Sequence, residues 1–230
     1  MQYTTLFFDL DETLYPPNSG LWEGIRQRIH DYMQALLGLP SADISRLREE
    51  YMAQYGTTLR GLQAHYHVDT EEYLAYVHDL PLRSYIGPDP NLHDLLLSLP
   101  QRRFIFTNAD TNHARRVMDV IGVTDCFDGI IDIEALQFIS KPDPAAYWRA
   151  LELADEPDPS HCVLFEDSAH NLAPARQMGF LTILVGDRPA TPAAQHIIHN
   201  LHQLPAALPE LWNGSSLPNA MRGSGVEIAR

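Results

Sequence analysis

The chain has 230 residues, 45% of them hydrophobic, which suits one well-packed core with a smaller accessory domain. Its formal net charge of −14 disfavours binding to nucleic-acid polymers or anionic membranes, and no apolar run approaches the ~20 residues that span a bilayer. The two cysteines form neither a CxxC motif nor a dense framework and the N-terminus has no basic leader, so a reducing cytoplasm is the expected location.

Short apolar runs alternate along the chain with longer helical patterns. Strands are predicted at residues 5–8, 104–107, 129–132, 162–165 and 181–185. Helices, marked by apolar residues three and four apart, are predicted at 91–99, 112–121, 145–153 and 171–178, with Gly122 and Gly179 ending two of them. This rhythm predicts an α/β fold with a Rossmann-like parallel sheet.

One long helical stretch interrupts that rhythm. Roughly eighty residues separate the first strand from residue 91, and those at 21–80 have an almost purely helical pattern, which is too long for a crossover. Proline pairs flank the stretch. We therefore predict a core built from residues 1–16 and 88–212, a helical cap at 17–87 and a flexible tail at 213–230.

Polar residues follow the predicted strands where their carboxyl ends should meet. In an open parallel sheet, ligands bind beyond those ends. The residues concerned are Asp9 and Asp11 after the first strand, Thr107 and Asn108 after the second, Lys141 in a later loop, and Glu166 and Asp167 after the fourth. Clustered carboxylates repel one another unless a cation holds them, and Mg²⁺ prefers such oxygen ligands. The pattern therefore predicts a magnesium site.

These residue types suit phosphoryl transfer to a carboxylate. Asp9 can attack phosphorus, while Asp11 can protonate the leaving oxygen and later activate a water molecule. Lys141 would neutralise negative charge on Asp9 and on the phosphoryl group. Thr107 and Asn108, with nearby backbone N–H groups, would bind the phosphoryl oxygens. Because the chain is acidic overall, a small phosphorylated metabolite needs such local cations.

The segment at residues 7–15, FFDLDETLY, resembles the first motif of the haloacid dehalogenase superfamily. Thr107-Asn108, Lys141-Pro142 and the segment FEDS at 165–168 are similar to the next three motifs, in order. The resemblance implies Asp9 as nucleophile and Asp11 as acid and base.

The same resemblance implies how the metal is held. Mg²⁺ would bind the Asp9 side chain, the Asp11 main-chain carbonyl and Asp167, with Glu166 beside the metal or just outside its coordination sphere. Dehalogenases of the superfamily usually lack the second aspartate of the first motif. The presence of Asp11 therefore favours a phosphatase.

Three segments resemble the pyrimidine 5′-nucleotidase branch of that superfamily: LYPP at 14–17, YGTTLRGL at 55–62, and Thr107-Asn108-Ala109 together with His113. The branch hydrolyses mononucleotides such as UMP and CMP. The resemblance therefore implies a nucleoside 5′-monophosphate as substrate, with a pyrimidine preferred. Arg60 and Tyr66 are candidate cap contacts to the leaving group, and Tyr15 is a further candidate substrate residue.

Several alternatives stay open. The substrate can instead be pyridoxal phosphate, phosphoglycolate or another small metabolite, and a sugar phosphomutase would keep the same residues. A binding module without catalysis would lack the nucleophile or the lysine, and neither is missing. Asn171 either binds a metal-bound water or caps the following helix. The histidines at 65, 67, 196, 199 and 202 lack the partners of a transition-metal site. A monomer or a homodimer is expected.

Overall fold

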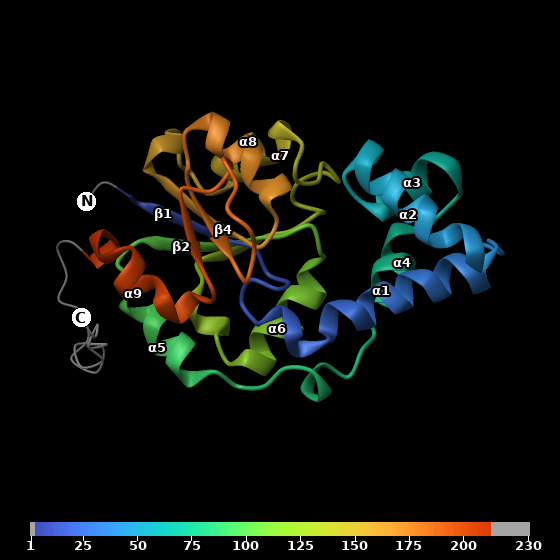
Figure 1. Ribbon diagram of the computed structural model, residues 1–230, viewed down its shortest axis with the longest axis horizontal. Coiled ribbons are helices and arrows are strands. Elements are labelled where there is room, and N and C mark those ends of the chain that lie inside the picture. Colours follow the sequence, from blue (N-terminus) through green and yellow to red (C-terminus); the bar gives the residue numbers. More distant parts are fainter. Residues whose placement is uncertain (1–2, 213–230) are drawn as a thin grey trace.

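A computed structural model describes residues 3–212 of the chain. Its centre is a parallel sheet of six strands in the order β3-β2-β1-β4-β5-β6, drawn in Figure 1. The strands are β1 (Thr5–Phe8), β2 (Arg102–Phe106), β3 (Gly129–Ile131), β4 (Cys162–Glu166), β5 (Leu181–Val185) and β6 (His196–Ile198). The predicted α/β fold and its five predicted strands are confirmed. The sequence pattern did not predict β6, a three-residue edge strand whose central Ile197 is exposed.

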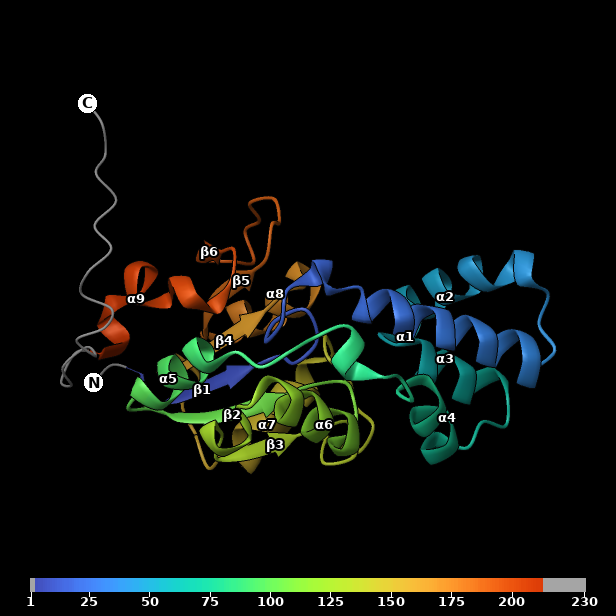
Figure 2. The same ribbon diagram turned by 90° about the horizontal axis from the view of Figure 1, so that it is seen from below.

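Helices cover both faces of the sheet (Figures 1 and 2). One face carries α5 (Pro90–Ser98), α6 (Thr111–Ile121) and α9 (Leu204–Ala207), and the other carries α7 (Pro144–Leu153) and α8 (Ala169–Met178). Successive residues of β1 enter opposite cores, Leu6 and Phe8 on the first face and Phe7 on the second. Burial on both sides explains why the strands are continuously apolar.

Capping residues set the limits of the core helices. Asp110 accepts a hydrogen bond from the backbone N–H of His113 and so begins α6, while Asp89 begins α5 in the same way. Gly122 and Gly179 end α6 and α8 in the left-handed conformation, at φ 84° and 105°, as predicted. Because the sheet is parallel, the crossover helices run antiparallel to the strands, and their N-termini lie near the carboxyl ends of the strands.

The long helical stretch forms a separate group of helices beside the sheet layers, on the right of Figure 1. It contains α1 (Leu21–Asp31), which continues as a π-helical turn (Tyr32–Leu36), α2 (Ser41–Tyr55), α3 (Thr58–His65) and α4 (Thr70–Val77). We call these helices the cap. Their packing depends on close approach, because Gly61 of α3 lies against the ring of Tyr51 in α2. The predicted domain limits at residues 16, 17, 87 and 88 stay predictions.

Short 3-10 turns complete the described chain, at Pro17–Ser19, Leu82–Ser84, Thr124–Cys126, Pro159–His161, Leu201–Gln203 and Pro209–Trp212. Within residues 3–212, no helix has the length and apolar character needed to cross a membrane. The predicted tail at 213–230 lies outside the described residues.

Candidate active site

A cleft of about 1220 Å³ lies between the carboxyl ends of the strands and the cap. Its core wall contains seven of the predicted site residues: Asp9, Asp11, Thr107, Asn108, Lys141, Glu166 and Asp167. Its cap wall contains Arg60, also predicted, together with Arg26, Arg48 and Tyr73. The parallel sheet explains this convergence, because the residues that follow its central strands emerge at one edge.

Lys141 is the centre of the core wall and the only lysine among the 230 residues. Its side chain is 1% exposed, and its Nζ lies 2.8 Å from Asp9 Oδ1, 2.7 Å from Glu166 Oε2 and 2.7 Å from the carbonyl oxygen of Phe106. Burial alone would lower the pKa of Lys141, but the two carboxylates raise it above its usual value. Lys141 is therefore a fixed cation beside the first aspartate.

The three neighbouring carboxylates carry more negative charge than Lys141 can balance. Oxygens of Asp9, Glu166 and Asp167 lie within 4.8 Å of one another. Burial and the charge of Glu166 raise the pKa of Asp9 to about 7, although Lys141 opposes the change. Burial likewise raises the pKa of Glu166 to about 7 and, with the charge of Asp9, that of Asp167 to about 6. A buried set of hard oxygen donors short of positive charge fits Mg²⁺.

Arg188 also reaches this group, and the sequence analysis did not identify it. Its Nη2 lies 2.8 Å from Asp167 Oδ2 and 3.1 Å from Glu12 Oε2. Arg188 stands three residues after β5, at the same edge of the sheet as the other site residues. Its position shortly after a predicted strand is the sequence feature from which Arg188 could have been predicted as a site residue.

Thr107 and Asn108 lie in the site in different ways. Asn108 holds the main chain of Lys141 from both sides: its Nδ2 donates to the Lys141 carbonyl at 3.0 Å, and its Oδ1 accepts from the Lys141 N–H at 2.9 Å. This arrangement differs from the predicted phosphate contact, because the amide is already engaged in placing the lysine. Thr107 Oγ1 accepts from the Ala109 N–H at 3.0 Å, which leaves its O–H available as a donor.

Asp11 has two donors of its own. Tyr15 Oη donates to Asp11 Oδ1 at 2.7 Å, and His113 Nε2 lies 2.9 Å from the same oxygen. Burial alone would raise the pKa of Asp11, but His113 and Tyr15 lower it below its usual value. The prediction for Tyr15 needs correction, since its buried ring lies outside the cleft wall and its hydroxyl binds Asp11. The packing of the loop after β1 buries the Tyr15 ring and brings its hydroxyl to Asp11.

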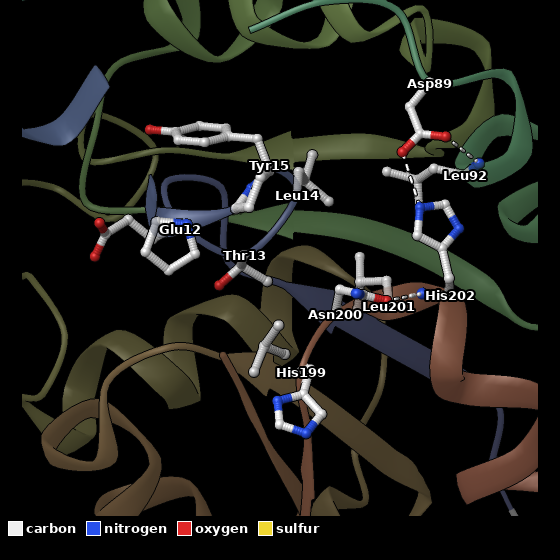
Figure 3. Close-up of a pocket in the computed structure, with 13 residues that line it drawn as sticks. Glu12, Thr13, Leu14, Tyr15, Asp89, Leu92, His199, Asn200, Leu201 and His202 are labelled. Atoms are coloured by element: carbon white, nitrogen blue, oxygen red, sulfur yellow. Dashed lines mark hydrogen bonds and ion pairs between the residues drawn. The ribbon is translucent and has the colours of Figure 1, made fainter. Parts of the chain in front are cut away.

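A smaller cavity of about 170 Å³ lies on the other side of that loop (Figure 3). Glu12, Thr13, Tyr15, His199 and His202 are among the residues that line it. His202 Nε2 lies 2.9 Å from Asp89 Oδ2, and His199 pairs with Asp187. These two histidines therefore serve as partners for single carboxylates.

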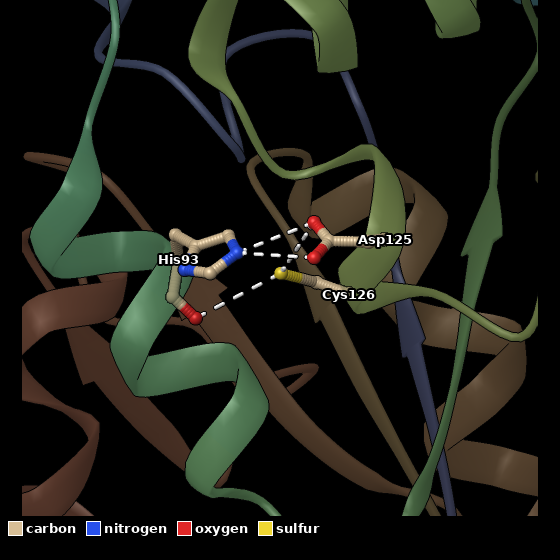
Figure 4. Close-up of side chains that lie close together, drawn as sticks. All are labelled: His93, Asp125 and Cys126. Atoms are coloured by element: carbon tan, nitrogen blue, oxygen red, sulfur yellow. Dashed lines mark hydrogen bonds and ion pairs between the residues drawn. The ribbon is translucent and has the colours of Figure 1, made fainter.

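A second group of potential metal ligands, shown in Figure 4, consists of His93, Asp125 and Cys126. His93 Nε2 lies 3.2 Å from Asp125 Oδ1, and the Cys126 thiol donates to the His93 carbonyl at 3.7 Å. Burial and the nearby Asp125 raise the pKa of Cys126 to about 11. Because metals bind the thiolate, this group is better described as a set of hydrogen-bonded side chains around the buried Cys126 thiol.

The cap wall contains more cations than anions, since its arginines accompany one carboxylate, Glu49. Arg60 lies in the first turn of α3, whose N-terminus is capped by Thr57. Arg48 of α2 was not identified from the sequence, and its buried Nε has no hydrogen-bond partner within the described part of the chain. Tyr66, a predicted contact, lies outside the cleft wall. Asn171 lies in the cleft wall within α8, so it does not cap that helix.

Comparison with known proteins identifies the class. The haloacid dehalogenase-like hydrolase family matches residues 3–179, so the chain belongs to this family of hydrolases. It is 31% identical over 188 residues to phosphate metabolism protein 8 of Saccharomyces cerevisiae, a match that covers 75% of this chain and 58% of that protein. The chain thus spans less than two thirds of the length of its yeast relative.

Solved structures share the fold. A magnesium-bound putative hydrolase of the family from Bacillus subtilis has a TM-score of 0.61 at 17% identity, covering 90% of this chain and 98% of its own. A phosphatase of the family from Thermococcus onnurineus has a TM-score of 0.60 at 19% identity, covering 88% and 96%. β-Phosphoglucomutase from Clostridium difficile has a TM-score of 0.58 at 18% identity, covering 88% of this chain and 93% of its own.

Proposed function

We propose that this hydrolase is a magnesium-dependent phosphatase that cleaves small phosphate monoesters through an aspartyl-phosphate on Asp9. The observation that carries the proposal is that one cleft contains two aspartates, each with its own set of hydrogen-bond donors. Asp9 is held by the ammonium of Lys141 at 2.8 Å, while Asp11, two residues later, has its own donors in Tyr15 and His113. A nucleophile and a proton donor need such different surroundings.

The chain's own groups account for both half-reactions. Asp9 attacks phosphorus and the ester P–O bond breaks. Asp11 gives the leaving oxygen a proton that it takes up with the substrate, because in the substrate-free site His113 and Tyr15 favour its ionised carboxylate. Asp11 then takes a proton from a water molecule, which attacks the aspartyl-phosphate, releases inorganic phosphate and restores Asp9. Lys141 keeps Asp9 in place, and the Thr107 hydroxyl binds a phosphoryl oxygen. Electrostatic positioning of this kind supplies most of the rate enhancement in phosphoryl transfer.

Mg²⁺ fits the donor set described above. The side chains of Asp9 and Asp167 and the main-chain carbonyl of Asp11 would hold it, with Glu166 beside it. When bound, the ion supplies the positive charge that the buried carboxylates and the phosphate oxygens require. Glu166 also accepts a hydrogen bond from Lys141, so it positions the lysine as well.

We propose a nucleoside 5′-monophosphate, with a pyrimidine preferred, as the substrate class. Two features support it. The segment that resembles the nucleotidase branch spans the last residue of α2, the turn after it and the first five residues of α3, and this brings Arg60 to the cleft. In addition, Arg60 and Arg48 offer donors to electron-rich groups such as the carbonyl oxygens of a base. The yeast relative, phosphate metabolism protein 8, carries phosphate metabolism in its name.

The test is inorganic phosphate release from UMP, CMP, AMP, pyridoxal phosphate, phosphoglycolate and an aryl phosphate. Wild type should act fastest on UMP and CMP with Mg²⁺, and EDTA should abolish this activity. Asp9→Asn should lose a factor on the order of 10⁴ or more, because the amide is no nucleophile. Asp187→Asn is a matched control at an exposed aspartate outside the cleft.

The outcomes separate the two levels of the proposal. Turnover of other esters alone, lost in Asp9→Asn, would keep the mechanism and reject the nucleotide. A folded, magnesium-loaded protein that released no phosphate from any compound would contradict the phosphatase itself. Transfer of phosphate within a sugar phosphate, without release, would instead indicate the mutase.

A further inference from the structure

His113 is a buried residue of α6 that the two half-reactions do not use directly. It is 1% exposed and lies in the first turn of α6, where its own backbone N–H is held by Asp110 Oδ1 at 2.9 Å. From there its Nε2 reaches Asp11 Oδ1 at 2.9 Å, across 102 positions of the sequence. Residues 110–113 therefore supply both the N-cap of α6 and the hydrogen bond to Asp11.

The surroundings of the ring assign its proton. The other nitrogen, Nδ1, is buried and has no hydrogen-bond partner among residues 3–212. A proton on Nδ1 would be a buried donor without an acceptor, which is costly. The proton therefore resides on Nε2, and His113 donates it to the carboxylate of Asp11.

A second histidine holds the ring in place. His78, at the end of α4, stacks on His113 with the ring centroids 4.1 Å apart and the planes at 16°. His78 Nδ1 is itself fixed by Asp110 Oδ2 at 2.7 Å. Arg116 of α6 donates to the carbonyl of His78 at 2.9 Å and to that of Leu80 at 2.8 Å. The chain segment that leaves the cap is thus bound to the helix that carries His113.

The two oxygens of Asp11 differ as a result. Oδ1 accepts from both His113 and Tyr15, whereas Oδ2 has no hydrogen bond to any residue that the structure describes. We propose that His113 is a positioning residue for the acid and base Asp11: it holds Oδ1 so that Oδ2 exchanges the proton with the leaving oxygen and with water. This inference rests on the proposed phosphatase activity.

The experiment uses leaving groups that differ in their need for a proton. His113→Phe keeps a ring against His78 and removes the donor, while His113→Gln returns an N–H near the position of Nε2. Each variant is compared with wild type on 4-nitrophenyl phosphate, whose leaving group departs unprotonated, and on the alcohol phosphate that wild type hydrolyses fastest. His67→Gln, at an exposed cap residue outside the cleft, is the matched control.

In His113→Phe, kcat/KM for the alcohol phosphate should fall by about 10- to 100-fold, since general acid catalysis is worth about 10²–10⁴. For 4-nitrophenyl phosphate, kcat/KM should stay within about 3-fold of wild type, because the first half-reaction needs no proton. The kcat of the variant for this ester should still fall, and nitrophenolate should appear in a burst, because water attack on the aspartyl-phosphate needs Asp11. His113→Gln should recover most of each loss.

Equal losses of kcat/KM on both esters would overturn the inference, as would a glutamine variant no better than phenylalanine. If His113→Phe does not fold, His113→Asn replaces it, because the shorter amide does not reach Asp11. If wild type releases phosphate but the loss in His113→Phe does not depend on the leaving group, only this inference is defeated. Wild type inactive on every ester defeats the proposed function and the role of His113 together.

Discussion

The charged side chains of the two cleft walls differ in whether they form ion pairs. On the core wall, charged groups have partners: Lys141 binds two carboxylates, Arg188 binds two more, and Asp11 is paired with His113. On the cap wall, Arg48 and Arg60 form no ion pair with any residue between 3 and 212. The core wall is therefore preorganised for one chemical step, while the cap wall keeps donors for a ligand.

This difference also answers the problem posed by the net charge of −14. The phosphorylated substrate proposed above would approach an acidic protein, so local cations would have to attract it. The core supplies Lys141 and the proposed metal at the phosphoryl group, and the cap supplies arginines for the rest of the molecule. Changes to the core wall should therefore affect stability and turnover, and changes to the cap wall should affect substrate binding.

The largest effect is expected when the partner of the core carboxylates is removed. Lys141→Met leaves Asp9 and Glu166 buried without their cation, and unpairing buried charges costs about 3–5 kcal/mol. We expect a loss of that size in the free energy of urea unfolding at pH 8, together with loss of phosphate release. Arg46→Met, which removes a cation from an exposed ion pair, should change the stability far less. Equal effects of the two changes would contradict the central role of Lys141.

Packing inside the cap gives the next effect. A Cβ added at Gly61 would lie 2.1 Å from Tyr51 Cγ, so Gly61→Ala should separate α2 from α3. Overpacking costs about 1–3 kcal/mol, which exceeds the helix-propensity gain of about 0.5–1 kcal/mol for alanine. We expect a lower midpoint in thermal unfolding. Gly87→Ala, where an added Cβ meets nothing within 4 Å, is the control, and a neutral Gly61→Ala would show that the helices adjust freely.

The cap arginines should act on affinity. Arg60→Gln and Arg48→Gln each remove a charged donor worth about 1.5 kcal/mol, so the KM for the proposed nucleotide substrate should rise about 10-fold. The kcat value should change less than about 3-fold, because the core wall is intact. Steady-state kinetics with Arg46→Gln as control measures this. A fall in kcat with unchanged KM would place these residues in the chemical step instead.

The smallest effect concerns pH and metal removal. The folded state raises the pKa of Asp9 from 3.8 and that of Glu166 from 4.5, both to about 7. The folded protein therefore binds more protons than the unfolded chain between pH ~4 and ~7, and its stability falls as pH rises through this window. In EDTA, each of the two groups should lower the free energy of unfolding by about 1 kcal/mol from pH 6 to pH 8.

Mg²⁺ should reverse this trend, because it binds the ionised carboxylates. Urea titrations at both pH values, with EDTA and with Mg²⁺, provide the measurement. The stabilisation by Mg²⁺ should be larger at pH 8 than at pH 6. Asp9→Asn should weaken both the pH dependence in EDTA and the response to the metal. A metal-free protein that gains stability from pH 6 to pH 8 would argue against the buried carboxylate cluster.

The sequence alone predicted the features that follow from local pattern. Five apolar runs separated by helical periodicity predict a parallel sheet, and its topology brings residues such as Asp9, Thr107 and Asp167 to one edge. A helical stretch too long for a crossover predicts an insertion. Both inferences need only the period of the hydrophobic residues and the order of the polar ones.

Only the tertiary structure decided which side chains meet. Lys141 and Asp9 are 132 positions apart, and His78 and Asp110 are 32 apart. Whether Tyr15 contacts a substrate or Asp11, whether Asn108 binds phosphate or the main chain of Lys141, and which arginines stay unpaired depend on packing between distant segments. A local pattern specifies which face of an element is buried, whereas a hydrogen bond within 3 Å depends on how several packed elements fit together.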